Sequence, residues 1–151
     1  MTTIAFDGHE MASDTLAVDG WGQINSVDKL FRGKDFLAGG SGSYGLLKRW
    51  WKNTRTLALH ELLAQGYPDY VKDTNDPGLM LVSTVSGVVY THTAGEFMLI
   101  SRRYHAIGSG RDYALAAMHL GRSASEAINL TMLFDVNTGG SVTVIPTTLR
   151  A

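Results

Sequence analysis

The second residue of the chain carries the groups best suited to covalent chemistry. The sequence begins Met1-Thr2-Thr3, and a methionine followed by a small threonine is a normal substrate for removal of the first residue. That removal would leave Thr2 with a free α-amine beside its hydroxyl. A hydroxyl is a weak nucleophile at neutral pH, but a neighbouring α-amine, which titrates near neutral pH, can accept its proton. Thr2 would then be nucleophile and base in one residue, on condition that Met1 is cleaved.

A β-hairpin is predicted to bring a carboxylate next to this residue. Residues 2–7 and 10–18 alternate as strands do, around the turn signal Asp7-Gly8-His9. If Gly8 and His9 form a two-residue turn, Thr3 lies opposite Asp14 and Thr2 opposite Thr15. The register therefore delivers Asp14 to the N-terminal end of the first strand.

The remaining pattern predicts strands, then helices, then strands, then helices. Strands are expected at 21–31 and 35–38, with a turn at Gly33-Lys34, and the stretch 39–43 (Gly-Gly-Ser-Gly-Ser) should bend the chain into a helix over 44–52. Later elements are a helix at 56–65, loops at 66–68 and 74–78, strands at 79–84, 88–93 and 97–107 with turns at 86–87 and 94–95, helices at 111–120 and 124–134, and a last strand at 141–147. Ser123 and Glu126 have capping-box spacing at the start of the last helix. Antiparallel hairpins with helices inserted in pairs predict an α+β fold with two stacked sheets and helices outside, in a single domain over 1–151.

Composition excludes several classes of protein. The 151 residues are 44% hydrophobic, carry a formal net charge of -1 and include no cysteine, so a thiolate metal site, a disulfide framework and a cysteine nucleophile are all impossible. Apolar runs are too short to span a bilayer, and no signal peptide is seen, which predicts a cytoplasmic protein without a membrane partner. The loop 73–76 lacks EF-hand spacing and His60-Glu61 lacks a second histidine, so no metal and no cofactor are expected.

One basic and aromatic segment, Lys48-Arg49-Trp50-Trp51-Lys52, supports an alternative interpretation. Such a helix can bind nucleic acid through phosphate contacts and base stacking. Paired tryptophans on a helix more often pack in a core or between subunits, with the basic residues at the rim. The second interpretation is favoured, and no nucleic-acid partner is expected.

Six short motifs then appear in an order that resembles the proteasome β subunit and its bacterial relative, the HslV peptidase. They are Thr2-Thr3-Ile4, Ala12-Ser13-Asp14-Thr15, Asp28-Lys29-Leu30, Gly40-Ser41-Gly42-Ser43, the segment 106–110 (Ala-Ile-Gly-Ser-Gly) followed by 113–117 (Tyr-Ala-Leu-Ala-Ala), and the segment 135–140 (Asp-Val-Asn-Thr-Gly-Gly). The resemblance covers the chain from Thr2 to about Ile145. It implies an N-terminal-nucleophile hydrolase with a four-layer αββα sandwich of two antiparallel sheets flanked by helices.

The resemblance also implies a role for each matching residue. Thr2 would attack the scissile carbonyl, and Lys29 would be the cation that lowers the pKa of its hydroxyl and amine. Asp14 matches the carboxylate that holds this lysine, and Gly42 matches the backbone N–H that stabilises the oxyanion. Ser109 and Asp135 match groups that hold the threonine amine, and Thr138 lies where the proteasome has a serine and keeps the hydroxyl. The pocket for the substrate side chain would be lined by Val27, Phe31, Gly40 and Tyr44, in which Gly40 would leave room for apolar or large side chains.

A threonine-type endopeptidase subunit of a self-compartmentalising, proteasome-like ring is therefore the expected function, acting on peptides or unfolded proteins. A homo-oligomeric ring or stacked rings would follow, and the resemblance leaves open an ATPase unfoldase as partner. Two alternatives remain: a catalytically silent ring or interaction protein that keeps Met1, and a small-molecule amidase that uses the same nucleophile.

Overall fold

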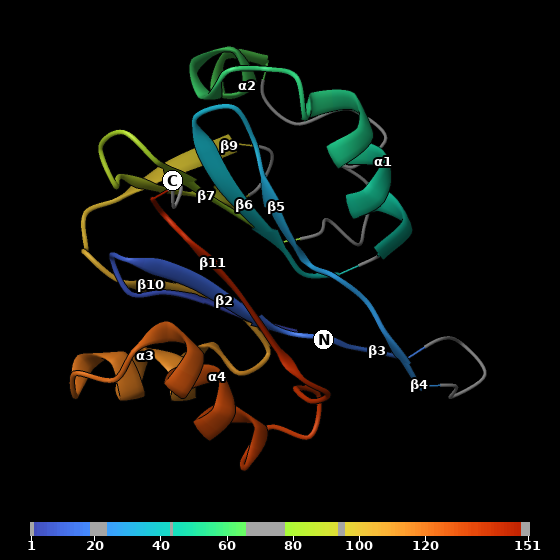
Figure 1. Cartoon of the computed structure of the whole chain (residues 1–151), viewed down its shortest axis with the longest axis vertical. Coiled ribbons are helices and arrows are strands. Elements are labelled where there is room, and N and C mark those ends of the chain that lie inside the picture. Colours follow the sequence, from blue (N-terminus) through green and yellow to red (C-terminus); the bar gives the residue numbers. More distant parts are fainter. Residues whose placement is uncertain (1, 19–23, 43, 66–77, 94–95, 149–151) are drawn as a thin grey trace.

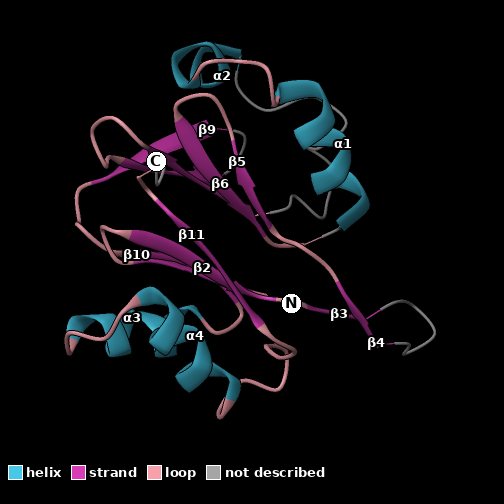
Figure 2. Ribbon diagram, in the orientation of Figure 1, coloured by secondary structure: helices cyan, strands magenta, loops and turns pink. Residues whose placement is uncertain are grey.

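Two antiparallel sheets lie face to face between two pairs of helices in a computed structural model, which describes residues 2–18, 24–42, 44–65, 78–93 and 96–148 (Figure 1). One sheet has the strand order β10-β1-β2-β11, formed by His105–Gly108, Thr3–Phe6, Glu10–Asp14 and Val142–Pro146. The other has the order β5-β6-β7-β8-β9, formed by Leu30–Arg32, Phe36–Gly40, Leu79–Ser83, Val89–Thr93 and Glu96–Ile100. Helices α1 (Tyr44–Thr54) and α2 (Leu59–Gln65) cover the five-stranded sheet, whereas α3 (Arg111–His119) and α4 (Ala124–Met132) cover the four-stranded one (Figure 2). The predicted four-layer αββα sandwich is confirmed.

Alternation along the strands explains why four layers form. In β1, Ile4 and Phe6 face the opposite sheet, and Ala5 between them faces α3 and α4. In β6, Leu37 faces the opposite sheet, and its neighbours Phe36 and Ala38 face α1 and α2. Because side chains alternate with a period of two, each sheet buries both faces. The small residues on one side of β1 allow α3 and α4 to pack closely.

The basic, aromatic segment lies on α1, where its tryptophans pack as the favoured interpretation predicts. Trp50 is completely buried in the cluster between α1, α2 and the five-stranded sheet. Trp51 stacks on Phe31, with ring centroids 4.9 Å apart. These faces are occupied by protein side chains and are not presented to a base.

The first hairpin has the predicted register. Ile4 pairs with Ser13 and Phe6 with Met11 across β1 and β2. Asp7 fixes the turn, because its Oδ1 accepts hydrogen bonds from the backbone N–H groups of His9 and Glu10 at 2.8 and 2.9 Å. The hairpin alone therefore places Asp14 beside Thr3.

Several predicted strands are interrupted where the chain leaves a sheet. The segment 10–18 breaks at Thr15, whose N–H and that of Leu16 both donate to the carbonyl of Gly139. Beyond this bend, β3 (Leu16–Val18) pairs only with β4 (Ile24–Ser26) and extends as an arm from the sandwich (Figure 1). The segment 21–31 divides into β4 and β5, with 21–23 outside the described residues, and 97–107 divides into β9 and β10 because the chain crosses from one sheet to the other.

Other boundaries move by a few residues. The turn predicted at Gly33-Lys34 is one residue later, since the Gly33 N–H donates to the carbonyl of Phe36. The second helix begins at Leu59 rather than at residue 56. The capping box of α4 is present in full, with Ser123 and Glu126 each accepting a hydrogen bond from the other's backbone N–H. The loop at 66–68, most of the loop at 74–78 and the turn at 94–95 lie outside the described residues, and within the described ranges no helix is long and apolar enough to cross a membrane.

Candidate active site

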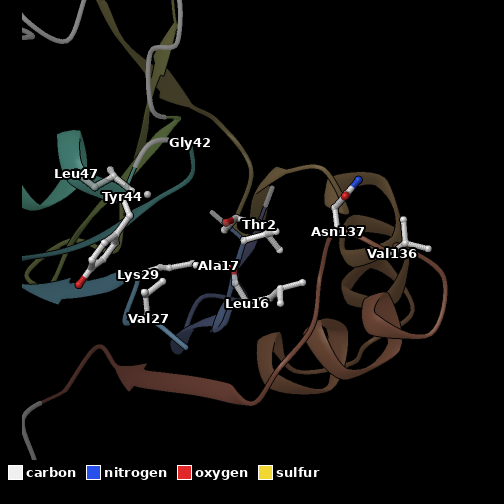
Figure 3. A pocket seen from close by; sticks show the side chains of 12 residues that line it. Thr2, Leu16, Ala17, Val27, Lys29, Gly42, Tyr44, Leu47, Val136 and Asn137 are labelled. Atoms are coloured by element: carbon white, nitrogen blue, oxygen red, sulfur yellow. Dashed lines mark hydrogen bonds between the residues drawn. The ribbon is translucent and has the colours of Figure 1, made fainter. Parts of the chain in front are cut away.

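Thr2 lies at the edge of a cavity of about 310 Å³ between the two sheets. Lys29 and Gly42 line the same cavity, and Figure 3 shows them on one side of Thr2 with Val136 and Asn137 on the other. The further lining residues are Leu16, Ala17, Val18, Val27, Gly40, Tyr44 and Leu47. Thr2, the residue predicted from the sequence to be the nucleophile, therefore borders an open space lined largely by apolar side chains.

Asp14 and Lys29 form a buried ion pair next to the first strand. Lys29 Nζ donates to Asp14 Oδ1 at 3.0 Å and to the carbonyl of Leu16 at 2.7 Å. The carboxylate also accepts the N–H of Thr3 on Oδ1 and that of Gly139 on Oδ2, both at 3.1 Å. Asp14 thus joins the nucleophile's strand, the lysine and the loop before β11, and its position agrees with the one derived from the hairpin register.

Burial lowers the pKa of Lys29, and the charge and hydrogen bond of Asp14 oppose that effect without cancelling it. Removal from water disfavours the ammonium form, whereas a neighbouring carboxylate favours it. Without Asp14, the lysine would lose its charge at a lower pH still. The cation beside Thr2 therefore depends on the carboxylate.

A second hydrogen-bond network joins Ser109, Thr138 and Asp135 near the start of β1. Asp135 Oδ2 accepts the hydroxyls of Ser109 and Thr138, each at 2.6 Å. The Ser109 backbone N–H donates to the carbonyl of Thr2 at 2.8 Å. The three residues predicted from the resemblance are therefore brought together, and through Ser109 they contact the backbone of the nucleophile.

Thr3 completes this network and is absent from the sequence prediction. Its hydroxyl lies 2.7 Å from that of Thr138 and accepts the N–H of Gly110 at 3.1 Å. Because Thr138 gives its proton to Asp135, Thr3 donates to Thr138, and a chain of bonds runs from the start of α3 to the carboxylate. The sequence offered one signal for this role. Thr3 begins a strand whose other residues, Ile4 to Phe6, are all apolar, and a hydroxyl buried in such a strand needs a polar partner.

The pKa of Asp135 is lowered despite partial burial. Burial alone raises the pKa, but the hydrogen bonds from Ser109, Thr138 and the Asn137 backbone outweigh it. The network is therefore built for an ionised Asp135, which places a negative charge close to the N-terminal segment.

Two glycines shape the backbone around Thr2. Gly108 pairs with Thr3 and has a φ of 100°, and a Cβ at this position would lie 1.8 Å from the carbonyl oxygen of Thr2. Gly42 has a φ of 101° and lies at the cavity edge. Its backbone approaches the space without a side chain, as close contact with a substrate carbonyl requires.

Three of the four residues predicted for the substrate pocket line this cavity: Val27, Gly40 and Tyr44. A Cβ on Gly40 would lie 2.2 Å from Leu47, so the glycine is needed for close packing of α1 against β6. Phe31 is not among the lining residues, since it stacks on Trp51 beneath α1. In its place Leu16, Leu47 and Val136 give the cavity its apolar surface, and the resemblance gave no signal for them.

The sequence matches no protein-family model and no curated protein. The arrangement of the described residues nevertheless has clear counterparts among solved structures. The fold is that of HslV. Similar structures are Thiobacillus denitrificans BPH in complex with epoxomicin (TM-score 0.71, 20% identity, 99% of this chain and 100% of the other), Thiobacillus denitrificans BPH (0.69, 21%, 99% and 99%) and eukaryotic HslV from Trypanosoma brucei (0.67, 20%, 95% and 98%).

The HslV fold confirms the αββα architecture that the motifs implied, over nearly the whole chain. At about one identical residue in five, the likeness establishes the fold and leaves the chemistry to be argued from the site itself.

Proposed function

We propose that this chain is a threonine peptidase whose nucleophile is Thr2 after removal of Met1. The observation that carries the proposal is the convergence of Thr2, the buried pair Asp14–Lys29 and the backbone of Gly42 at one cavity. These residues come from four separate parts of the sequence. A strand pair needed only for stability would have no reason to bury a lysine at the edge of an open cavity.

The proposed reaction begins with attack of the Thr2 hydroxyl on the carbonyl carbon of the substrate amide. The hydroxyl proton passes to the α-amine of Thr2, directly or through water, and the positive charge of Lys29 favours the neutral, proton-accepting form of that amine. The N–H of Gly42 would donate to the oxyanion of the tetrahedral intermediate. Collapse expels the amine of the leaving peptide, which takes up the proton, and leaves an ester on Thr2 that water hydrolyses.

Support for a peptide substrate comes from the cavity and from the fold. Leucine, valine and tyrosine side chains line the cavity, so it fits an apolar or large side chain next to the cleaved bond. BPH, which has the same fold, has been solved in complex with epoxomicin. We expect this chain to bind epoxomicin as well.

The proposal extends to self-assembly, because an apolar patch is exposed beside the site. Leu133 and Phe134 are 78% and 61% exposed at the end of α4, and Tyr113 of α3 stacks on Phe134 with ring centroids 5.5 Å apart. With Leu130, these residues form what we call the α4 patch. Large neighbouring apolar side chains on a surface are typical of an interface, and a homo-oligomer is the partner we propose. An ATPase unfoldase would be a further partner of such a ring.

Intact mass combined with an inhibitor tests the enzymatic proposal. The purified protein is expected to have lost Met1 and to gain the mass of one epoxomicin, an epoxyketone that reacts with an N-terminal threonine. Thr2→Ala is the matched control, since alanine is equally small and permits the same removal of Met1, but it should gain no mass and hydrolyse no peptide. A trimmed Thr2 chain that gains no mass would contradict the proposal, and a chain that keeps Met1 would favour the silent ring.

A further inference from the structure

A second cavity, of about 260 Å³, is lined by residues of β9, β10, α3 and the segment between the two strands, and shares none of its lining with the cavity at Thr2. It opens where the chain passes from β9 to β10, which are edge strands of the two sheets, and where α3 begins. Two groups of residues line it: Ser101, Arg102, His105 and Arg111 are polar or basic, and Leu99, Ile100 and Leu115 are apolar. The described lining contains no carboxylate, so its charge is positive.

His105 is the buried polar group of this cavity. The residue is 9% exposed, and no hydrogen bond or ion pair of its imidazole occurs within the described part of the chain. Its ring nitrogens are not among the buried atoms without a partner in the described residues, so they keep contact with solvent and can be reached from the cavity. A ligand with an acceptor oxygen in the cavity would receive a hydrogen bond from the imidazole.

The two arginines supply positive charge that neighbouring carboxylates offset only weakly. Among the described residues, Arg102 has no carboxylate within ion-pair distance, and Arg111 lies 3.5 Å from Asp112 in a pair that is mostly exposed to water. Burial, Arg111 and Arg102 together lower the pKa of His105. The positive field is thus strong enough to act on the ring, and an anion between the three groups would relieve it.

The apolar side of the cavity indicates what else the ligand carries. Leu99 of β9, which is 62% exposed, and Leu115 of α3 line the same cavity as the basic groups. The volume is just below that of typical small-molecule pockets, about 300–1,000 Å³, so it suits a small molecule or the end of a chain. A bare inorganic anion would leave the leucine surface in water.

We infer that this cavity binds the carboxylate of a small apolar molecule, held by Arg102, Arg111 and His105, with its apolar part against Leu99 and Leu115. Two sources share this chemistry: the C-terminus of a peptide that ends in an apolar residue, and a short fatty acid. The site is separate from Thr2, and its existence does not depend on peptidase activity.

Proton NMR of the histidine ring tests the inference on the whole protein. The His105 signal, assigned by its loss in His105→Gln, is followed against pH in N-acetyl-leucine, hexanoate, acetate or sodium chloride at equal ionic strength. A bound carboxylate favours the imidazolium, so the midpoint should rise by about one pH unit in the first or second ligand compared with chloride. A larger rise in N-acetyl-leucine identifies a peptide terminus, and a larger rise in hexanoate identifies a fatty acid.

The variant Arg102→Ala/Arg111→Ala should lose most of this rise, and Arg55→Ala, which removes an exposed arginine beyond α1, should keep it. Both should still form the Thr2 adduct at the normal rate, which separates this site from the enzymatic proposal. The inference is overturned if neither carboxylate shifts the midpoint beyond chloride, if acetate is as effective as both, or if the double variant retains the full rise.

Discussion

Burial of the charged pair Asp14 and Lys29 costs desolvation free energy. Each charge has left water, and the penalty is offset only while both are present and hydrogen-bonded. Lys29→Met should destabilise the fold by about 3 kcal/mol, the lower end for a broken buried pair, because two backbone N–H groups still bind Asp14. Peptide hydrolysis should fall at least about 100-fold with the loss of the cation. Urea unfolding and steady-state kinetics measure the two effects.

The double variant Asp14→Asn/Lys29→Met separates stability from chemistry. It removes both charges together, so its loss of stability should be smaller than the sum of the two single losses. Its hydrolysis should remain as low as that of Lys29→Met. Recovery of activity in the double variant would show that Lys29 serves only the fold.

Asp135 should give the protein part of its sensitivity to acid. Its pKa is lowered in the folded state, so its contribution to stability is complete above the pKa of an unfolded aspartate and is lost as pH falls through the folded value. Asp135→Asn should therefore lose less stability than the wild type between pH 6 and pH 3, as measured by urea unfolding at each pH. Glu61→Gln, on the exposed face of α2, should follow the wild-type curve; an unchanged slope in Asp135→Asn would contradict this role.

Sequence predicted the residues that lie close to Thr2 better than those that complete the site. Asp14 followed from the hairpin register alone, since a two-residue turn leaves no freedom in the pairing. Lys29 and Ser109 needed the resemblance, because they come from strands and loops whose meeting is a tertiary matter. Thr3 was missed for the same reason, and Phe31 was misplaced because its stacking on α1 depends on how a helix packs.

At the scale of elements, the backbone at the end of β10 contacts Thr2 directly, through the close approach of Gly108 and the N–H of Ser109. Gly108→Ala would combine a left-handed backbone with a Cβ 1.8 Å from the Thr2 carbonyl oxygen. Since backbone atoms cannot rotate away, we expect a loss of at least about 2 kcal/mol and a displaced Thr2. Thermal unfolding and the rate of epoxomicin addition measure these effects.

Gly87→Ala is the matched control for this element. Gly87 also has a positive φ, of 74°, but a Cβ there meets no atom within 4 Å. The variant should lose only about 1 kcal/mol of backbone strain and react with epoxomicin as the wild type does. Equal losses in both variants would show that the approach to Thr2 is not the cause.

The order and type of the elements were predictable, but the places where strands change partners were not. The strands β1, β2 and β7 could be identified from the sequence because each is a short, largely apolar segment bounded by a turn or loop signal, as expected of a strand that buries both faces. The bend at Thr15 depends on the Gly139 carbonyl, and the crossing between β9 and β10 joins two sheets. The bend and the crossing both depend on hydrogen bonds between residues far apart in the sequence, and such bonds leave no periodic signal in the local sequence.

At the scale of the whole molecule, the α4 patch brings several exposed apolar side chains together on one surface. Leu133 and Phe134 follow the last turn of α4, in the segment that continues to Asp135 and Val136 at the active-site cavity. Assembly through this patch would therefore enclose the approach to Thr2. An enclosed site would favour unfolded chains over folded proteins as substrates.

Leu133→Lys/Phe134→Lys tests this arrangement. Two charges placed in an apolar interface should shift the protein from its assembled state to a monomer in sedimentation velocity, because buried lysines without partners cost more than the contact provides. Val85→Lys is the control, since Val85 is more exposed than either patch residue, at 85%, but lies in the loop between β7 and β8, away from the patch. The monomer should keep its four layers and its reaction with epoxomicin, since the patch side chains are not part of the cavity. A wild-type protein that sediments as a monomer would refute assembly, and a double variant that assembles as the wild type does would place the interface on another face.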